Sequence, residues 1–176
     1  FSPALSSEKQ TAMNGGFRYA PATRIYIQFN NRFWENESLN GWGNTDLPEE
    51  IWQPSWDMTG NTGILMSYLR WSAAEDMDTL NEDERNNAVL NRWENIFEGS
   101  INNFDKGVSK SWVLDEWSKG AWASPTTSQN ETLNESIAQI EGRIHFAGEH
   151  ASNDRGWMQG ALFSGLRAAT EIKNSN

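Results

Sequence analysis

The sequence predicts an α+β fold, or part of a larger α/β protein, and three observations carry this prediction. Segments with strand periodicity and segments with helix periodicity both occur, without the regular alternation of strand and helix that builds a parallel sheet. The chain has 176 residues, of which 37% are hydrophobic, which is enough for one compact domain with a buried core. No internal repeat or low-complexity segment interrupts the pattern.

Strands are predicted where apolar and β-branched residues alternate or cluster. Residues 23–29 alternate between apolar and polar positions, and residues 64–71 form a second apolar run. Shorter strands are expected over residues 110–113 and 143–147, the latter buried. Residues 40–62 are rich in Gly, Asn, Asp and Pro, which indicates a loop with short strand pieces at most.

Helices are predicted at three places. Residues 6–14 begin with a serine that can cap a helix, and two glycines follow that end it. Residues 82–97 start with acidic residues and then place apolar side chains at helical spacing. Residues 157–172 carry apolar and small side chains at i, i+3 and i+4, which indicates a long helix. Residues 124–135 are polar and are expected to form a loop.

Charge and composition exclude several functions. The formal net charge is -10 and the pI about 4.6, so the surface repels phosphate backbones and no nucleic-acid partner is expected. The chain has no cysteine, and its two histidines, His145 and His150, lack the spacing of metal ligands on one helix face, so no metal site is predicted. No apolar run approaches the roughly 18 residues of a membrane span.

The strongest chemical signal lies in the last third of the chain. Residues 142–150 read Gly-Arg-Ile-His-Phe-Ala-Gly-Glu-His, and residues 156–169 contain Gly-Trp-Met-Gln-Gly-Ala followed by Ser-Gly-Leu-Arg-Ala-Ala. A glycine that opens a helix leaves first-turn N–H groups free for an electron-rich acceptor. Gly148 would admit a ligand close to the backbone, and Glu149 would accept hydrogen bonds from ligand hydroxyls. The alternative is an ordinary strand, loop and helix with a capping carboxylate.

Taken together, these residues resemble the C-terminal FAD-contact motif of the flavin amine oxidases, the family of L-amino-acid, monoamine and polyamine oxidases. Its elements lie at residues 146–149, 156–158 and 164–169. The resemblance implies that Glu149 binds the ribityl or ribose region of FAD and that the backbone of residues 157 and 158 faces the flavin C2 carbonyl. The cofactor-binding residues that it implies are Trp112, Trp117, Gly148, Glu149, Gly156, Trp157, Met158 and Ala161.

The segment from Trp112 to Trp122 resembles a second block of the family. The resemblance places Trp112 beside the flavin, with Trp122 and Trp157 on either side of the substrate. Aromatic walls of this kind would hold an amine near the flavin and exclude water. Core packing is the alternative for these tryptophans, above all for Trp117. Ala121 stands where monoamine oxidases carry their flavin-linked cysteine, so FAD is expected to be non-covalent.

Residues 1–6, 19–25 and 33–35 look like the substrate-domain segment of the family. Arg24 stands where many members carry a lysine that holds a water near flavin N5, which makes it the one catalytic candidate. Arginine is larger, planar and permanently charged, so a surface or salt-bridge arginine remains the alternative. Tyr68 matches a tyrosine that hydrogen-bonds the substrate carboxylate in L-amino-acid oxidases; the alternative is a half-buried strand tyrosine. The substrate-binding residues implied are Tyr68, Trp122, Gly156 and Trp157.

The resemblance implies an α+β fragment of a two-domain FAD-dependent amine oxidase. Residues 1–110 would form mainly the mixed sheet of the substrate-binding domain, and residues 111–176 the C-terminal strand and helix of the FAD-binding domain. The family also needs a Rossmann Gly-x-Gly-x-x-Gly, which this chain lacks. Companion chains are therefore expected to supply it, and a first residue of Phe1 fits a processed subunit or a shortened chain.

The function expected is that of an L-amino-acid oxidase that is active only with its remaining chains. It would transfer hydride from Cα to flavin N5 and yield a 2-oxo acid, ammonia and H2O2, with O2 as the final acceptor. A monoamine or polyamine oxidase is the first alternative, and a non-catalytic scaffold the second. The assembly is expected to dimerise. Three Asn-x-Ser/Thr sequons, at Asn36, Asn130 and Asn134, tilt the expected location toward a secreted protein.

Overall fold

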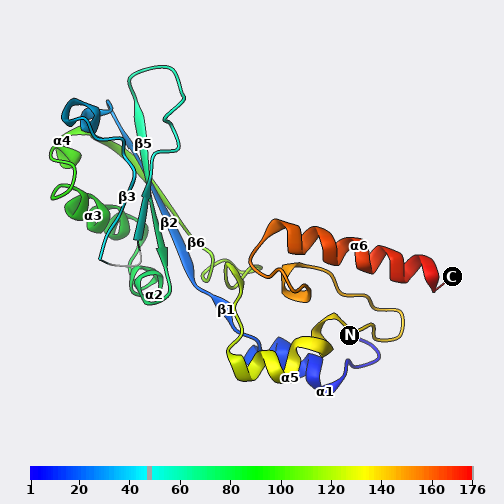
Figure 1. The fold of residues 1–176 in the computed structure, drawn as a ribbon. Coiled ribbons are helices and arrows are strands. Elements are labelled where there is room, and N and C mark those ends of the chain that lie inside the picture. Colours follow the sequence, from blue (N-terminus) through cyan, green and yellow to red (C-terminus); the bar gives the residue numbers. More distant parts are fainter. Residues whose placement is uncertain (47–48, 176) are drawn as a thin grey trace. The chain divides into compact units, whose positions relative to one another are not determined.

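The computed structural model describes residues 1–46 and 49–175 (Figure 1). The chain divides into two compact units, the first made of Phe1–Ala20 and Ala121–Asn176 and the second of Pro21–Gly120. The predicted division at residue 110 grouped the first twenty residues with the substrate-binding part. In the structure they pack with the C-terminal residues instead. Buried Lys9 shows why, because its Nζ donates to the carbonyls of Ile137 at 3.1 Å and Gln139 at 2.6 Å.

The second unit is built on a five-stranded sheet with the order β3-β4-β5-β2-β6. Strands β2 (Ala22–Phe29) and β5 (Gly63–Arg70) form its centre and pair along their whole length. Strands β4 (Glu49–Trp52) and β3 (Gly43–Asn44) extend it on one side, and β6 (Phe104–Ser111) lies on the other. All these pairings are antiparallel, so within the described residues the sheet is not mixed.

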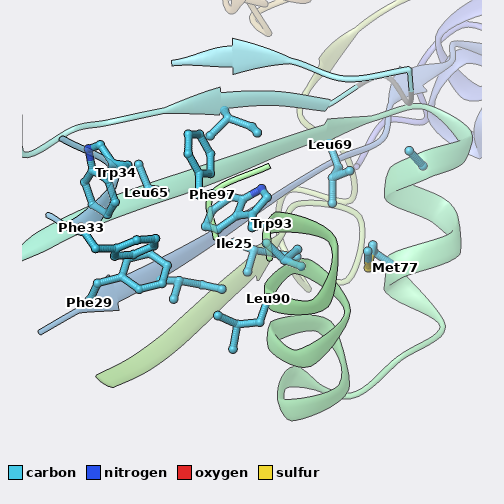
Figure 2. Packing of buried hydrophobic residues seen from close by; sticks show 14 of the residues in the cluster. Ile25, Phe29, Phe33, Trp34, Leu65, Leu69, Met77, Leu90, Trp93 and Phe97 are labelled. Atoms are coloured by element: carbon cyan, nitrogen blue, oxygen red, sulfur yellow. The ribbon is translucent and has the colours of Figure 1, made fainter. Parts of the chain in front are cut away.

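Side chains of the two sheet faces differ in burial, as the strand period of two requires. Along β2, Ile25, Ile27 and Phe29 are fully buried, while Arg24 and Tyr26 on the other face are half-buried. Helices α2 (Ser72–Asp78) and α3 (Glu82–Trp93) cover the buried face (Figures 1 and 2). The opposite face of the sheet carries the half-buried side chains of Arg24 and Tyr26.

Aromatic rings fill much of the core beneath these helices, as Figure 2 shows. The ring centroid of Phe29 lies 5.3 Å from that of Phe33 and 5.6 Å from that of Trp34, both in edge-to-face geometry. Phe33 and Trp34 belong to a 3-10 helix, η2 (Phe33–Glu37), and a short helix α4 (Ser100–Asn103) leads into β6. Such aromatic pairs contribute beyond their buried area, so this core keeps the sheet in a fixed geometry.

The first unit is mainly helical and has its own small core. Its buried hydrophobic residues are Phe17, Ala123, Leu133, Ile137 and Ala151. Its elements are α1 (Ser7–Thr11), the wide turn η1 (Ala12–Gly16), β1 (Tyr19–Ala20), β7 (Trp122–Ala123), α5 (Thr127–Ala138), the 3-10 turn η3 (Glu149–Ala151) and α6 (Met158–Asn174). Strands β1 and β7 pair with each other.

Helix α5 corrects the prediction of a loop over residues 124–135. Thr126 and Gln129 form a reciprocal capping box, in which each side chain accepts a hydrogen bond from the other residue's backbone N–H. Leu133 and Ile137, four residues apart, are buried on one face of the helix. The sequence prediction missed the helix because it relied on the polar composition of the segment and overlooked the capping box and the two apolar residues.

Two strand predictions were also wrong in extent. The buried strand expected over residues 143–147 is reduced to an isolated bridge between Glu141 and Ile144, and none of these five residues is fully buried. Strand β6 runs from Phe104 to Ser111, whereas the sequence predicted a strand only over residues 110–113. Most of β6 was missed because it is an edge strand with exposed side chains and lacks the apolar alternation on which the prediction depends. Helix α2 was not predicted, and α3 ends at Trp93 rather than residue 97.

Candidate functional site

Glu149 holds together two segments of the first unit. Its Oε1 accepts a hydrogen bond from the backbone N–H of Ala123 at 2.8 Å, and its Oε2 accepts one from that of Gly156 at 2.7 Å. The carboxylate therefore joins β7 to the turn that precedes α6. Each oxygen keeps a second lone pair, so Glu149 retains acceptor capacity for a ligand hydroxyl while it positions the backbone.

Gly148 and Ser164 fix the bend before Glu149. Gly148 has φ of 146°, a conformation that residues with a Cβ rarely adopt, and a Cβ added there would also lie 2.4 Å from the ring of His150, which would have to move. The buried Oγ of Ser164 accepts from the Gly148 N–H at 2.9 Å and lies 2.8 Å from the Gly148 carbonyl. Helix α6 thus holds the glycine that the sequence assigned to close backbone approach.

The N-terminus of α6 is suited to an electron-rich group. The helix has 17 residues, and no side chain caps its first turn. Trp157 and Met158 at this end are 70% and 79% exposed. Uncapped first-turn N–H groups and the helix dipole favour an acceptor that gains negative charge, which fits a flavin C2 carbonyl.

Gly160, on the first turn of α6, shows how tightly the preceding loop is held against it. A Cβ on Gly160 would lie 2.1 Å from the carbonyl oxygen of Asp154. The loop between η3 and α6 therefore lies in backbone contact with the helix. Ala161, the remaining residue assigned to the cofactor on this turn, is exposed.

Trp122 and Gly156 lie side by side in the first unit. Trp122 pairs with Ala20 across the β1–β7 strands, and a Cβ on Gly156 would lie 3.4 Å from its Cδ1. Since Glu149 binds the Gly156 N–H and the N–H of the residue after Trp122, these three predicted site residues form one cluster. Trp157 follows Gly156 directly and is exposed.

Trp112 and Trp117 lie in the second unit, after β6. Trp117 is 87% exposed, so within the described residues it does not pack in a core, and Trp112 is partly exposed beneath the Nζ of Lys110. Asp115 holds the turn between them by accepting from Lys110 Nζ at 2.5 Å and from the backbone N–H of Ser118 at 2.8 Å. The Lys110 contact and these amides hold the pKa of Asp115 far below its usual range.

Arg24 and Tyr68 face each other across the central strands of the second unit. They are direct partners in the β2–β5 pairing, and the Arg24 guanidinium carbon lies 4.6 Å from the centre of the Tyr68 ring. Burial lowers the pKa of Arg24, but the nearby hydroxyls of Tyr26 and Tyr68 raise it by more, so the group stays charged. The structure therefore brings together the two residues assigned to substrate and catalysis in this unit.

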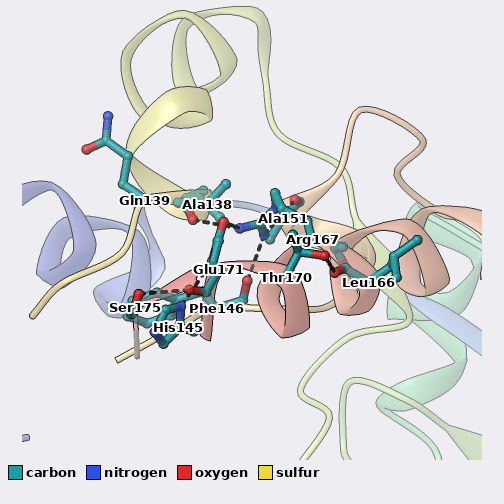
Figure 3. A network of polar contacts seen from close by, with 12 residues as sticks. Ala138, Gln139, His145, Phe146, Ala151, Leu166, Arg167, Thr170, Glu171 and Ser175 are labelled. Carbon is teal, nitrogen blue, oxygen red and sulfur yellow. Dashed lines mark hydrogen bonds and ion pairs between the residues drawn. The ribbon is translucent and has the colours of Figure 1, made fainter. Parts of the chain in front are cut away.

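Arg167 positions three segments, and its role was not predicted. Its guanidinium donates to the carbonyls of Phe146 at 2.7 Å and Ala138 at 3.2 Å and to the Glu171 carboxylate at 2.6 Å (Figure 3). Glu171 also contacts His145 Nδ1 at 3.1 Å. The network attaches the segment before Gly148 to α6, and the Ser-Gly-x-Arg-Ala-Ala pattern was the available signal.

Arg155 forms a second unpredicted clamp, in the loop before Gly156. Its Nε donates to the His150 carbonyl at 3.1 Å, one terminal nitrogen donates to Asn130 Oδ1 at 2.8 Å, and the other bonds Asn134 Oδ1. Two of the three sequon asparagines therefore have structural roles on α5. No sequence motif predicted this role of Arg155.

Within residues 1–46 and 49–175, no group of three or more His, Asp or Glu side chains is placed to hold a metal ion. Over the same residues, no helix combines the length and the apolar character that crossing a bilayer requires.

The chain belongs to the flavin-containing amine oxidoreductase family, whose model matches residues 1–173. It is 33% identical to an L-amino-acid oxidase of Siganus canaliculatus over 98% of this chain. It is 30% identical to an L-amino-acid oxidase of Naja atra over its whole length. The cyclohexylamine oxidase of Brevibacterium oxydans IH-35A shares the fold with a TM-score of 0.83 at 20% identity, over 99% of this chain and 39% of that one.

The chain spans about a third of the length of these curated relatives, 34% and 36% respectively. Membership of this family supports a flavin cofactor.

Proposed function

We propose that the protein containing this chain is an FAD-dependent oxidase of L-amino acids. The observation that carries the proposal is the cluster around Glu149, in which one carboxylate fixes Trp122 and Gly156 beside the uncapped start of α6. FAD, when bound, supplies the acceptor for the Cα hydride and passes the electrons to O2, giving H2O2 and an imino acid that hydrolyses to a 2-oxo acid and ammonia.

The residues of this chain would bind and orient. Backbone N–H groups at the start of α6 would stabilise negative charge at the flavin C2 carbonyl, and Glu149 would accept from a ribityl or ribose hydroxyl. Trp122 and Trp157 would wall the substrate and exclude water, and Trp112 and Trp117 would contact the flavin. Tyr68 would hydrogen-bond the substrate carboxylate.

Amino acids are favoured over simple amines as substrates for two reasons. The curated relatives at 33% and 30% identity are named L-amino-acid oxidases. In addition, Tyr68 lies against the charged guanidinium of Arg24, which repels an ammonium group and attracts a carboxylate. A monoamine or polyamine substrate remains the second candidate, because the family model that matches the chain is that of the flavin-containing amine oxidoreductases.

Further chains and the location belong to the same proposal. The Rossmann motif would come from a companion polypeptide, produced as a separate chain or by cleavage of one precursor, and the assembly would dimerise. FAD would be held without a covalent bond, since no cysteine is present in the 176 residues to attach it. Secretion is proposed from the sequons, of which Asn36 is exposed.

A visible spectrum of the complete protein with all its chains tests this function. Flavin bands that bleach on anaerobic addition of an L-amino-acid mixture, and return with air, are expected. Bleaching by amines alone would move the assignment to an amine oxidase. A complete protein that carries no flavin would favour the non-catalytic scaffold. Release of FAD on acid precipitation tests the non-covalent binding.

A further inference from the structure

The open face of the central sheet carries a row of charged and aromatic side chains. Glu50 pairs with Tyr68 across β4–β5, Tyr68 with Arg24 across β5–β2, and Arg24 with Lys110 across β2–β6. Directly paired residues in antiparallel strands have their Cβ atoms about 5 Å apart and point to the same face. Arg70, two residues after Tyr68, points to this face as well.

The two cations that lie nearest to Arg24 on this face are already neutralised. Arg70 forms an ion pair with Glu50 at 2.6 Å, and Lys110 forms one with Asp115 at 2.5 Å. Within the described residues, Arg24 has no carboxylate partner, and its Nε is buried without a hydrogen-bond partner. A buried donor that lacks a partner costs free energy, so this position suits an acceptor that arrives from outside the chain.

The geometry at Arg24 selects among acceptors. The guanidinium presents donors in a planar fork that matches a carboxylate, and the Tyr68 ring restricts it from one side at 4.6 Å. The Tyr68 hydroxyl adds a further donor next to that fork. An ammonium group is repelled here, and a carboxylate is attracted.

We infer that Arg24 and Tyr68 together bind the α-carboxylate of the substrate, so that Arg24 determines the preference for amino acids over amines. The inference rests on the proposed function and gives Arg24 a role other than that of the family lysine, which holds a water. The structural alternative is that a carboxylate side chain from the remainder of the protein binds the Arg24 guanidinium.

The test uses the complete protein and benzoate as a carboxylate probe, measured by titration calorimetry so that the readout needs neither flavin nor turnover. Arg24→Gln is expected to weaken benzoate binding by about 10- to 100-fold, the range for a hydrogen bond to a charged group. Arg24→Lys keeps the charge and loses the fork, so it should lose less. Lys110→Gln is the matched control, because it removes a neighbouring charge that Asp115 already neutralises.

Turnover supplies the second readout where the enzyme is active. Arg24→Gln should lower kcat/KM for L-phenylalanine by about 10- to 100-fold and leave kcat/KM for phenethylamine within about threefold. Equal loss for both substrates would overturn the inference and assign Arg24 to flavin chemistry. Benzoate affinity that is unchanged in Arg24→Gln would also overturn it and indicate a protein carboxylate in the fork. If no amino acid bleaches the flavin spectrum of the wild-type protein, the proposed function is refuted. The role of Arg24 in binding a carboxylate is still tested, because the benzoate titration does not depend on turnover.

Discussion

At the scale of single residues, Glu149 has a dual role. A carboxylate that accepts from two backbone amides of different segments acts as part of the scaffold even before any ligand is bound. Besides any contact with a cofactor, the Glu149 side chain also sets the distance between β7 and the turn at Gly156. Its substitution should therefore affect stability and flavin binding together.

The substitution Glu149→Gln tests this dual role. The amide group replaces one acceptor oxygen with a donor that faces a backbone N–H, so one hydrogen bond is lost and a donor is left unpaired. We expect a loss of about 1–3 kcal/mol in stability and a weaker hold on flavin. Thermal unfolding and flavin retention on gel filtration measure the two effects. Glu131→Gln, on the exposed side of α5, is the control, and an equal loss there would refute the clamp.

His150 makes the first unit sensitive to pH. Burial lowers the pKa of its imidazole below 6.5; Glu149 opposes this shift, and Arg155 and Lys9 add to it. The unfolded state therefore binds the proton more readily. The contribution of His150 to stability is full above about pH 6.5 and is lost as the pH drops from there to the lower pKa of the folded state. The melting temperature should decline on going from about pH 7 to pH 5.

The variant His150→Gln separates this effect from other titrating groups. It removes the imidazole, and the decline between about pH 7 and pH 5 should become shallower than in the wild type. His145→Gln serves as the comparison, because His145 contacts the Glu171 carboxylate instead of an apolar wall. A wild-type slope that His150→Gln leaves unchanged would show that other groups cause the pH dependence.

At the scale of elements, α6 offers a matched pair of glycines. A Cβ on Gly160 would lie 2.1 Å from a backbone oxygen, whereas a Cβ on Gly165 meets nothing within 4 Å among the described residues. Gly160→Ala should therefore cost about 1–3 kcal/mol, because the loop must move away. Gly165→Ala should be neutral or stabilise by up to about 1 kcal/mol through helix propensity. Chemical denaturation of both variants measures the difference, and equal effects would contradict the close approach at Gly160.

Elements were predictable from sequence where the spacing of apolar side chains is regular. The strand at 23–29 was confirmed, and it buries one face. The helix at residues 157–172 was confirmed as well, although the apolar residues that predicted it, such as Leu162 and Leu166, are exposed among the described residues, and its buried stripe is Gly160, Ser164 and Ala168. Helix α5 was missed because its stability rests on a capping box and two buried side chains within a polar segment. The prediction of a strand at 143–147 was wrong: within the described residues no strand pairs with this segment, and Arg167 binds the backbone carbonyl of Phe146.

At the scale of the whole molecule, the sequence predicted which residues belong to the candidate site but not how they contact one another. The motif residues at 146–149 and 156–158 pointed to a flavin, and the structure shows how Glu149 connects them. The contacts of the positioning arginines, Arg155 and Arg167, could not be found this way. Most of their partners are asparagines and backbone carbonyls 21 to 29 residues away in the sequence. Contacts of this kind depend on the fold and leave no local pattern.

The exposed face of α6 leads to the last prediction. Leu162 and Leu166 lie one turn apart and are 72% and 68% exposed, next to exposed Phe163. Contiguous apolar surface of this kind marks a contact with further protein surface, and the chain spans about a third of its relatives' length. We therefore expect the 176-residue chain alone to self-associate and to bind FAD far more weakly than the complete protein.

The substitution Leu162→Glu tests the role of this apolar face in the isolated chain and in the complete protein. In the isolated chain it should reduce self-association, measured by light scattering, because a charge interrupts the apolar face. In the complete protein it should destabilise the assembly by about 2 kcal/mol or more, because a carboxylate would then be buried without a partner. Asn174→Glu adds the same charge to the exposed end of α6 and should do neither. If Leu162→Glu leaves the complete protein as stable as the control, this face is open to solvent there, and the prediction is refuted.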